Sequence, residues 1–184
     1  MLNSPRLKLL FLTFLVEGAA LAAALLLAEF FEIQLFPLTK NLLRDILLGV
    51  FWTLFPLALF IFALSKKAGR LPILRSLRRI VLTDIKELIS SARLMDLFLI
   101  SALAGFAEEL LFRGVIQVKL GIVAASVIFG LFHFISPAYV VIATIMGLYI
   151  GILFHLYESL LIPVELHFIY DFGALVYLRY FVRE

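Results

Sequence analysis

The sequence predicts an all-α protein, a polytopic transmembrane helix bundle with about six spans and a basic amphipathic segment between spans two and three. Two observations carry this prediction. Of the 184 residues, 64% are hydrophobic and only 16% are charged, whereas soluble domains have roughly 45–50% apolar residues and about 25% charge. A chain this short cannot hide the excess in a core, because a small globule leaves much of its surface in water. The apolar residues also fall into runs near the length that crosses a bilayer, about 20 residues.

The first two expected spans are residues 9–31 and 46–64. Arg6 precedes the first run, and Glu17 interrupts it. A basic residue before an apolar run is also typical of a secretory signal peptide. This run is longer than the apolar core of such a peptide, and further spans follow it. We therefore expect a retained membrane helix, with Glu17 turned into the bundle.

Residues 65–96 form a basic segment with eight Lys or Arg residues and three acids. Leu74, Leu77 and Val81 recur in it at helical spacing, which favours an amphipathic helix lying along the membrane surface. A solvated helical loop fits the charge pattern equally well. In either case an excess of Lys and Arg marks the cytoplasmic side. With six spans, both termini are expected on that side too.

Four further spans are expected at 97–117, 120–134, 139–156 and 160–180. We expect a single membrane domain, in which residues 1–96 supply membrane helices and the basic segment, and 97–184 supply the helices that carry the candidate functional residues described below. Gly147 and Gly151 predict close helix packing. The chain has no cysteine, which excludes disulfides and thiolate chemistry. Its basic residues lie beside membrane spans, so the expected surroundings are the lipid bilayer and not nucleic acid.

The last four expected spans contain an unusual set of six ionisable residues, in motifs described below. Such groups are costly in hydrocarbon and usually face a bundle interior or a water-filled cavity. The six are Glu108, Glu109, Arg113, His133, His167 and Asp171. They are the candidate functional residues.

Glu108 and Glu109 are adjacent acids with one nearby cation. Glu109 and Arg113 are four residues apart, so they share a helix face and can form an ion pair. Glu108 is rotated by about 100° from Glu109 and can face a cavity of its own. A simple packing ion pair explains Glu109 and Arg113 but leaves Glu108 without a cation. We therefore expect Glu108 to act as a general acid or base.

The histidines are weaker signals when taken singly. His133 lies one turn after Phe129, and a single histidine in an apolar span is more often structural than catalytic. His167 and Asp171 are four residues apart, so the aspartate can accept from the imidazole and fix its tautomer. The structural alternative is a local hydrogen bond that makes both groups tolerable in lipid.

Together these residues resemble the three ordered motifs of the CPBP intramembrane proteases, the family of CAAX proteases and bacteriocin-processing (Abi) proteins. The motifs here are Glu108-Glu109-x-x-x-Arg113, Phe129-x-x-x-His133 and His167-x-x-x-Asp171. The resemblance covers roughly residues 97–177. It implies an intramembrane endopeptidase of a prokaryotic cell membrane, which hydrolyses a peptide bond in a membrane-associated protein or peptide.

The resemblance also implies a role for each residue of the first two motifs. Glu108 would activate the attacking water, and His133 would hold or polarise that water. Glu109 and Arg113 would brace the helix. These roles meet the needs of peptide hydrolysis in a membrane, which are a polar pocket, a base and stabilisation of the oxyanion.

In the last motif, His167 and Asp171 would support the developing oxyanion or bind a metal. The family pattern usually ends in asparagine, and Asp171 takes that place here. A carboxylate donates no hydrogen bond unless it is protonated. The sequence therefore requires a protonated Asp171 or a different division of labour at this position.

One divalent metal ion, zinc, is an open alternative. Two histidines and a carboxylate, with water in the fourth position, form a common hydrolytic zinc site. The candidate ligands are Glu108, His133 and His167. The compact motif His-Glu-x-x-His is absent, so these ligands would have to converge from separate helices.

Two other classes of function stay open. The resembled family includes members associated with bacteriocin immunity, so a non-catalytic immunity or partner-binding protein of the same fold is the alternative. Intramembrane acids and histidines also mark small transporters and proton pathways, although no paired repeats are evident. The six-span count also places Glu108 beyond the membrane midplane, as seen from the cytoplasm.

Overall fold

The computed structural model describes residues 4–65 and 67–182, and every regular element in these ranges is helical. Lys66, one of the eight basic residues counted above, lies outside them. Five helical stretches of the described chain are long and apolar enough to cross a membrane. These are Pro5–Phe30, Leu42–Leu64, Leu94–Phe132, Pro137–Tyr157 and Leu161–Phe181. The chain is an integral, multi-pass membrane protein, as its composition predicted.

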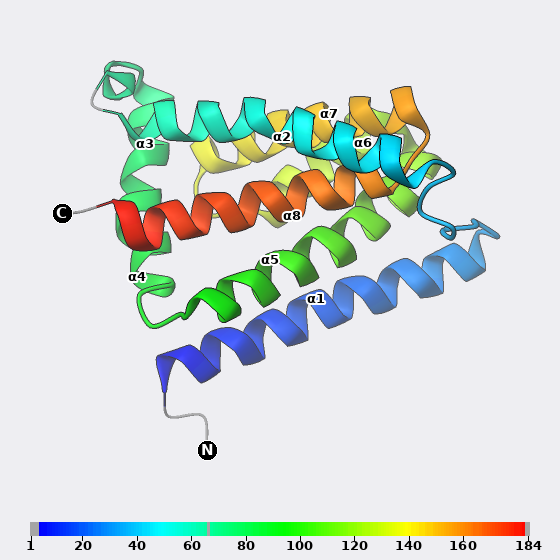
Figure 1. The fold of residues 1–184 in the computed structure, drawn as a ribbon, viewed down its shortest axis with the longest axis horizontal. Helices are drawn as coiled ribbons and strands as arrows, with labels where there is room; N and C mark the ends of the chain where they lie inside the picture. Colours follow the sequence, from blue (N-terminus) through cyan, green and yellow to red (C-terminus); the bar gives the residue numbers. More distant parts are fainter. Residues whose placement is uncertain (1–3, 66, 183–184) are drawn as a thin grey trace.

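The α-helices are labelled as in Figure 1. They are α1 (Pro5–Phe30), α2 (Leu42–Leu64), α3 (Pro72–Ile80), α4 (Lys86–Leu88), α5 (Leu94–Glu109), α6 (Gln117–Phe132), α7 (Pro137–Tyr157) and α8 (Leu161–Val176). A 3-10 turn occupies Ala68–Arg70, and π-helical segments occupy Val81–Ile85, Leu110–Ile116 and Tyr177–Phe181. Ser4 and Ser136 cap α1 and α7 with their side-chain oxygens, because the first N–H groups of a helix have no partner within it.

The expected third and fourth spans lie in one helical stretch, Leu94–Phe132, that turns back on itself. Gly121 has φ +82° and ψ 169°, a backbone conformation that glycine adopts far more readily than other residues. In a straight helix, Glu108 and His133 would lie about 37 Å apart at 1.5 Å per residue. Their side chains are 3.6 Å apart. The sequence predicted about six spans, and the structure has five continuous helical stretches. The difference is that Leu94–Phe132 contains two of the expected spans, one on each side of Gly121.

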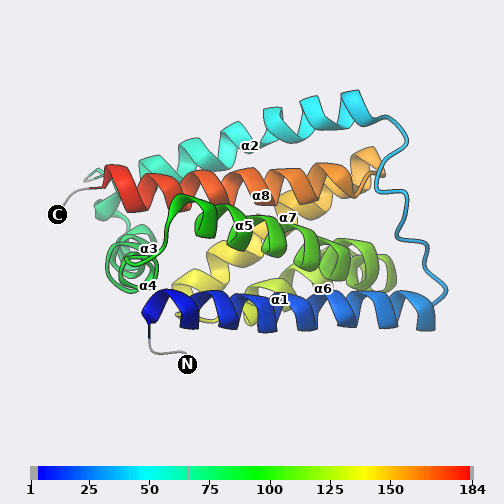
Figure 2. The same ribbon diagram turned by 60° about the horizontal axis from the view of Figure 1, so that its bottom comes forward.

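The long helices run alongside one another, and the two described ends of the chain lie at the same end of the bundle (Figures 1 and 2). In Figure 1, α2, α8, α5 and α1 lie in front in that order, with α6 and α7 behind them. Contacts join α5 to α1 and α8, α2 to α8, and α6 to α7. This order brings α5, α6 and α8, which carry the candidate residues, to the middle of the bundle.

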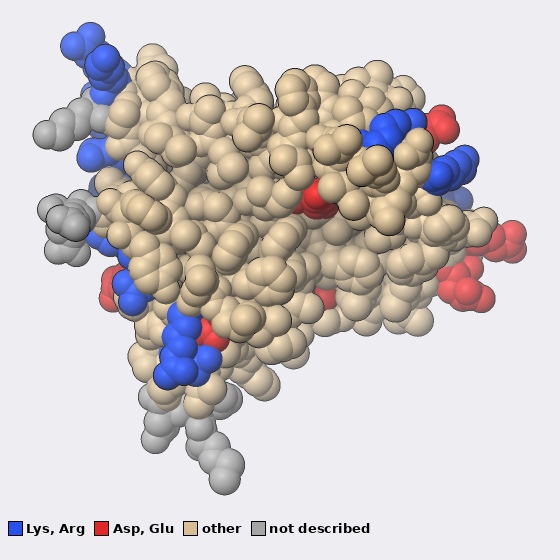
Figure 3. All heavy atoms as spheres, in the orientation of Figure 1, with Lys and Arg blue, Asp and Glu red and all other residues tan. Residues whose placement is uncertain are grey.

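The basic segment forms a surface helix, residues 72–88, that lies across the end of the bundle where both described ends meet (Figures 1 and 2). Its apolar residues Leu77 and Val81 are buried in a cluster with Leu9, Leu97 and Leu178. Figure 3 shows charged residues at both ends of the molecule, with Lys and Arg prevailing at this end, and few charges across the middle of the visible face. The amphipathic helix is therefore confirmed over the solvated loop.

Glycines allow two helix pairs to pack closely at the site. A Cβ atom on Gly105 of α5 would lie 2.9 Å from the backbone N of Phe168 on α8. One on Gly147 would lie 3.2 Å from Ser126, and one on Gly151 would lie 2.7 Å from Oε1 of Gln117. The close packing predicted from Gly147 and Gly151 is confirmed for the α6–α7 pair, and Gly105 does the same for α5 and α8.

Candidate functional site

Glu109, at the end of α5, is a buried carboxylate that contacts both a cation and a histidine. Its Oε2 lies 3.1 Å from Nε of Arg113, and the two side chains are 0% and 1% exposed. Its Oε1 lies 2.7 Å from Nδ1 of His167 on α8. The ion pair expected from the sequence is present, but Glu109 also holds His167, a contact that helical spacing did not predict.

Arg113 lies in the π-helical segment after α5 and is held by contacts to α6 and α7. Its Nη2 is 3.4 Å from the carbonyl oxygen of Gly147, and its guanidinium carbon is 4.8 Å from the ring centroid of Phe129. Its Nε and Nη1 make no hydrogen bond to a described residue. The contact with Glu109 is therefore a charge pair and not an aligned hydrogen bond.

His167 has a carboxylate at each ring nitrogen. Nδ1 faces Glu109 at 2.7 Å, and Nε2 faces Oδ2 of Asp171 at 3.4 Å. Carboxylates accept hydrogen bonds, so both nitrogens must carry protons to donate at both sides. The imidazolium form satisfies both contacts, and in that form the ring has no lone pair to offer.

Glu108 contacts the other histidine. Its Oε2 lies 3.6 Å from Nε2 of His133 and has no hydrogen-bond partner among the described residues. Nδ1 of His133 is 2.8 Å from the carbonyl oxygen of Phe129. Because a carbonyl only accepts, Nδ1 carries the proton and Nε2 of the neutral ring keeps its lone pair. A separation of 3.6 Å is too long for a direct hydrogen bond but allows both atoms to bind one water.

Exposure divides the site residues into two sets. The side chains of Glu108, His133 and Asp171 are 14%, 28% and 31% exposed, whereas those of Glu109 and Arg113 are sealed inside the bundle. The first set is partly open and the second is sealed. Of the two adjacent acids, Glu108 is the more exposed one, although its Oε2 is itself buried.

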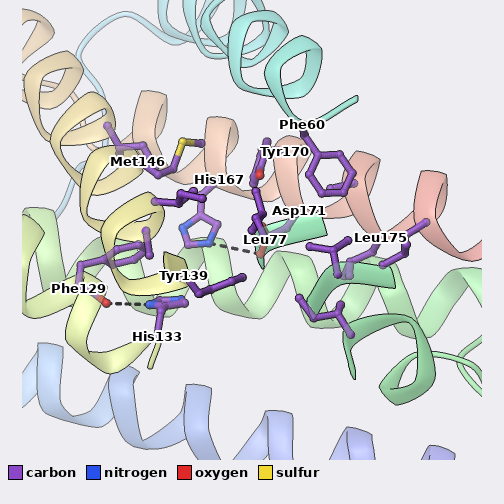
Figure 4. A pocket seen from close by; sticks show the side chains of 17 residues that line it. Phe60, Leu77, Phe129, His133, Tyr139, Met146, His167, Tyr170, Asp171 and Leu175 are labelled. Carbon is purple, nitrogen blue, oxygen red and sulfur yellow. Dashed lines mark hydrogen bonds and ion pairs between the residues drawn. The ribbon is translucent and has the colours of Figure 1, made fainter. Parts of the chain in front are cut away.

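A cavity of about 230 Å³ leads from the histidines to the surface helix. His133, His167 and Asp171 line its polar end together with Tyr139 and Tyr170 (Figure 4). The remaining lining is apolar and includes Phe60, Leu77, Val81, Ile85, Ile142 and Leu175. Glu108 does not line the cavity itself but lies beside it, against His133. The cavity therefore has a polar end, at the histidines, and an apolar remainder.

The depth of the site follows from the helix rise. Glu108 is 14 residues after the start of α5, which puts it about 21 Å from the basic end of the bundle. This is more than half the thickness of a hydrocarbon core of about 30 Å. Leu77, Val81 and Ile85 of the surface helix line the cavity, so it extends back from the site toward the basic end.

Sequence reasoning missed two tyrosines of the site and left one acid without a role. Tyr139 and Tyr170 line the cavity, but in apolar spans they are indistinguishable from packing or interfacial aromatics. Glu17 is buried on α1 with no partner for its Oε2 among the described residues. The sequence feature that could have identified Glu17 as part of the site is its carboxyl group within an apolar run.

The donor set does not fit the zinc site considered above. In the part of the chain that the structure describes, no group of three His, Cys, Asp or Glu side chains is placed to hold a metal ion. His167 would also have to release a carboxylate before it could offer a lone pair. Glu108, His133 and His167 thus do not converge as ligands.

Comparisons with known proteins identify the segment that carries the site. Residues 90–173, a little under half of the chain, match the family model described as Type II CAAX prenyl endopeptidase Rce1-like. The uncharacterized protein YpbD of Bacillus subtilis (strain 168) is 33% identical over 89 residues, which cover 47% of this chain and 47% of YpbD. The match thus spans about half the length of that relative. No solved structure matches significantly. The resemblance inferred from the three motifs is confirmed over this segment.

Proposed function

We propose that this chain, whose residues 90–173 match the type II CAAX prenyl endopeptidase family, is an intramembrane endopeptidase acting on a membrane-associated protein or peptide. The family match supports a protease of this type, and the bacterial relative supports a prokaryotic cell membrane as its location. One observation supports assigning this activity to particular residues. Glu108 and His133, from separate helices, meet at 3.6 Å beside a cavity.

Glu108 is the general base in this proposal. One water donates its hydrogens to Oε2 of Glu108 and Nε2 of His133, and its oxygen attacks the carbonyl carbon of the scissile bond. Glu108 takes a proton from the water as the new C–O bond forms. It returns that proton to the leaving nitrogen as the C–N bond breaks, which yields a new carboxyl terminus and a new amino terminus.

Glu109, Arg113 and His167 position and polarise the site. The buried Arg113 holds Glu109, which in turn holds the ring of His167 against α5. The imidazolium places positive charge at the cavity wall, where it stabilises the negative charge that develops on the substrate carbonyl. Asp171 orients the other side of the ring. The apolar lining of the cavity favours a substrate with an apolar group next to the scissile bond.

The proposal is tested by comparing the termini of membrane proteins in cells that express wild type or Glu108→Ala at matched abundance. New termini that appear only with wild type support proteolysis and identify substrates. Identical termini, with the wild-type phenotype retained by the variant, would favour the immunity or partner-binding alternative.

Glu165→Ala is the matched control for that comparison. Glu165 is also a carboxyl group in a span, and it packs against Gly49 of α2. Two residues along a helix amount to a rotation of about 200°, so Glu165 faces away from His167 and the cavity. This variant should produce the same new termini as wild type.

A further inference from the structure

The three motifs leave the oxyanion of the proposed reaction without a free hydrogen-bond donor. The carbonyl oxygen becomes an anion in the transition state, and fixed donors aimed at it supply much of the catalysis in acyl transfer. Asp171 stands where the family pattern usually has asparagine, and an ionised carboxylate only accepts. The inference below, which identifies the missing donor, rests on the proposed endopeptidase function.

The other motif residues are already committed. Both N–H groups of His167 face carboxylates. The Nδ1–H of His133 faces the carbonyl of Phe129, and its Nε2 faces Glu108. Arg113 has nitrogens without hydrogen bonds, but its side chain is buried and does not line the cavity. A donor must therefore come from outside the motifs.

Tyr139 brings a phenolic hydroxyl to the polar end of the cavity. It lines the cavity with His133 and Asp171, and Figure 4 shows its side chain reaching from beside His133 toward Asp171. Its hydroxyl has no hydrogen-bond partner among the residues that the structure describes. The hydroxyl is thus free to donate to a substrate.

The start of α7 fixes the position of Tyr139. Its backbone N–H donates to Oγ of Ser136 at 3.2 Å, the cap of this helix. The cap fixes the backbone of this turn, and the ring of Tyr139 packs against the buried clusters that contain Leu97 and Phe129, so it enters the cavity already oriented. Donors held in place before the reaction stabilise a developing charge more strongly than mobile ones.

We propose that the Tyr139 hydroxyl donates the hydrogen bond to the oxyanion and replaces the donor that Asp171 does not supply. Tyr170 also lines the cavity, but it comes from α8 and its ring packs edge-on against Phe60. Tyr139 is the better-placed donor, because it packs against the cluster of Phe112, Phe129 and Ala143, and the ring of Phe129 lies 4.3 Å from that of His133, where the water binds.

The test measures cleavage by purified protein, using as substrate a polypeptide whose new terminus depends on Glu108. Tyr139→Phe removes a single oxygen and should lower kcat by about 100- to 1,000-fold, as loss of one oxyanion donor does, with KM changed less than about threefold. Tyr170→Phe should lower kcat less than about tenfold. Tyr180→Phe alters an exposed ring away from the cavity and should match wild type.

An added Asp171→Asn change separates donor loss from structural damage. The asparagine amide supplies an N–H donor at the motif position. The kcat of the double variant should therefore be at least about tenfold higher than that of Tyr139→Phe alone. A Tyr139→Phe enzyme with wild-type kcat would overturn the inference and leave Glu108-dependent proteolysis intact. Equal activity of the single and double variants would also overturn it. Failure of wild type to cleave any substrate would overturn both proposals.

Discussion

Oε1 of Glu109 lies 2.7 Å from Nδ1 of His167, which joins α5 to α8 at the centre of the bundle. This contact gives the two adjacent acids different tasks. Glu109 is neutralised on one side by Arg113 and on the other by His167, and its side chain is sealed from solvent. Glu108 has neither partner and remains partly exposed beside His133. The structure therefore separates an acid that holds the site together from one that can exchange protons.

Glu109→Gln should destabilise the protein, whereas Glu108→Gln should mainly remove its activity. The first change leaves Arg113 buried without a carboxylate, and breaking a buried pair in this way typically costs about 3–5 kcal/mol. The second alters a group that has no hydrogen-bond partner for its Oε2 among the described residues. Glutamine keeps the shape of glutamate, so each variant differs from wild type only in the charge and hydrogen bonding of one side chain.

Thermal unfolding of the purified variants in detergent measures this difference, together with cleavage of a Glu108-dependent substrate. We expect a clearly lower melting temperature for Glu109→Gln and one close to wild type for the inactive Glu108→Gln. A Glu109→Gln protein as stable as wild type would contradict the assignment of Glu109 to the buried pair.

Gly105→Ala should disturb the site without altering any polar residue. The added Cβ would lie 2.9 Å from the backbone N of Phe168 and 3.0 Å from the carbonyl oxygen of Val164, so α5 and α8 must separate. Overpacking of this kind typically costs about 1–3 kcal/mol, and it pulls Glu109 from His167. We expect activity to fall at least about tenfold, measured at matched protein concentration.

Gly18→Ala is the matched control for Gly105→Ala. Gly18 also lies in a membrane helix, but a Cβ atom added to it would have no neighbouring atom within 4 Å. The same added methyl group should leave both activity and melting temperature unchanged. Equal losses in the two variants would show that the approach of α5 to α8 does not decide the effect, because alanine favours a helix over glycine.

Local spacing was enough to predict much of the fold and part of the site. Apolar runs predicted the membrane helices, because each run must satisfy its backbone within itself in lipid. Four-residue spacing predicted that Glu109 would meet Arg113 and that His167 would meet Asp171, because residues four apart share a helix face. Both contacts are present, at 3.1 Å and 3.4 Å.

Contacts between distant helices could not be predicted from spacing. Glu109 and His167 are 58 positions apart, and nothing in either motif sets the helix pairing that brings them together. The turn between the third and fourth spans was expected at residues 118–119, and the positive φ of Gly121, +82°, puts it two residues later. Tyr139 carries no charge and lies in an apolar run. These features depend on how the helices pack, and packing is a property of the whole bundle.

Chelators should leave proteolysis unchanged. Both ring nitrogens of His167 face carboxylates, and the described residues form no three-ligand cluster. The proposed chemistry therefore uses a base and charged groups of the chain itself. We expect full activity of purified protein after dialysis against EDTA and 1,10-phenanthroline, with well under one equivalent of zinc by elemental analysis. Stoichiometric zinc, with activity lost on chelation and restored by zinc alone, would contradict this expectation.

The two ends of α5 should lie on opposite sides of the membrane, with the surface helix in the cytoplasm. The chain has no cysteine, so single cysteines give labelling without background. Lys119 is exposed near the turn, with its Nζ 4.8 Å from the ring centroid of Phe31, and Arg79 is exposed on the surface helix. The positive-inside rule puts Arg79 in the cytoplasm, and the single crossing by α5 then puts Lys119 outside.

An impermeant maleimide applied to spheroplasts should therefore label Lys119→Cys directly and Arg79→Cys only after lysis. This result would place the surface helix, and the cavity that Leu77, Val81 and Ile85 line, at the cytoplasmic side. A substrate would then reach the site from the cytoplasm, although Glu108 lies about 21 Å from that end by the helix rise. Labelling of Arg79→Cys alone in intact spheroplasts would reverse this orientation. Labelling of both would show that α5 does not cross the membrane.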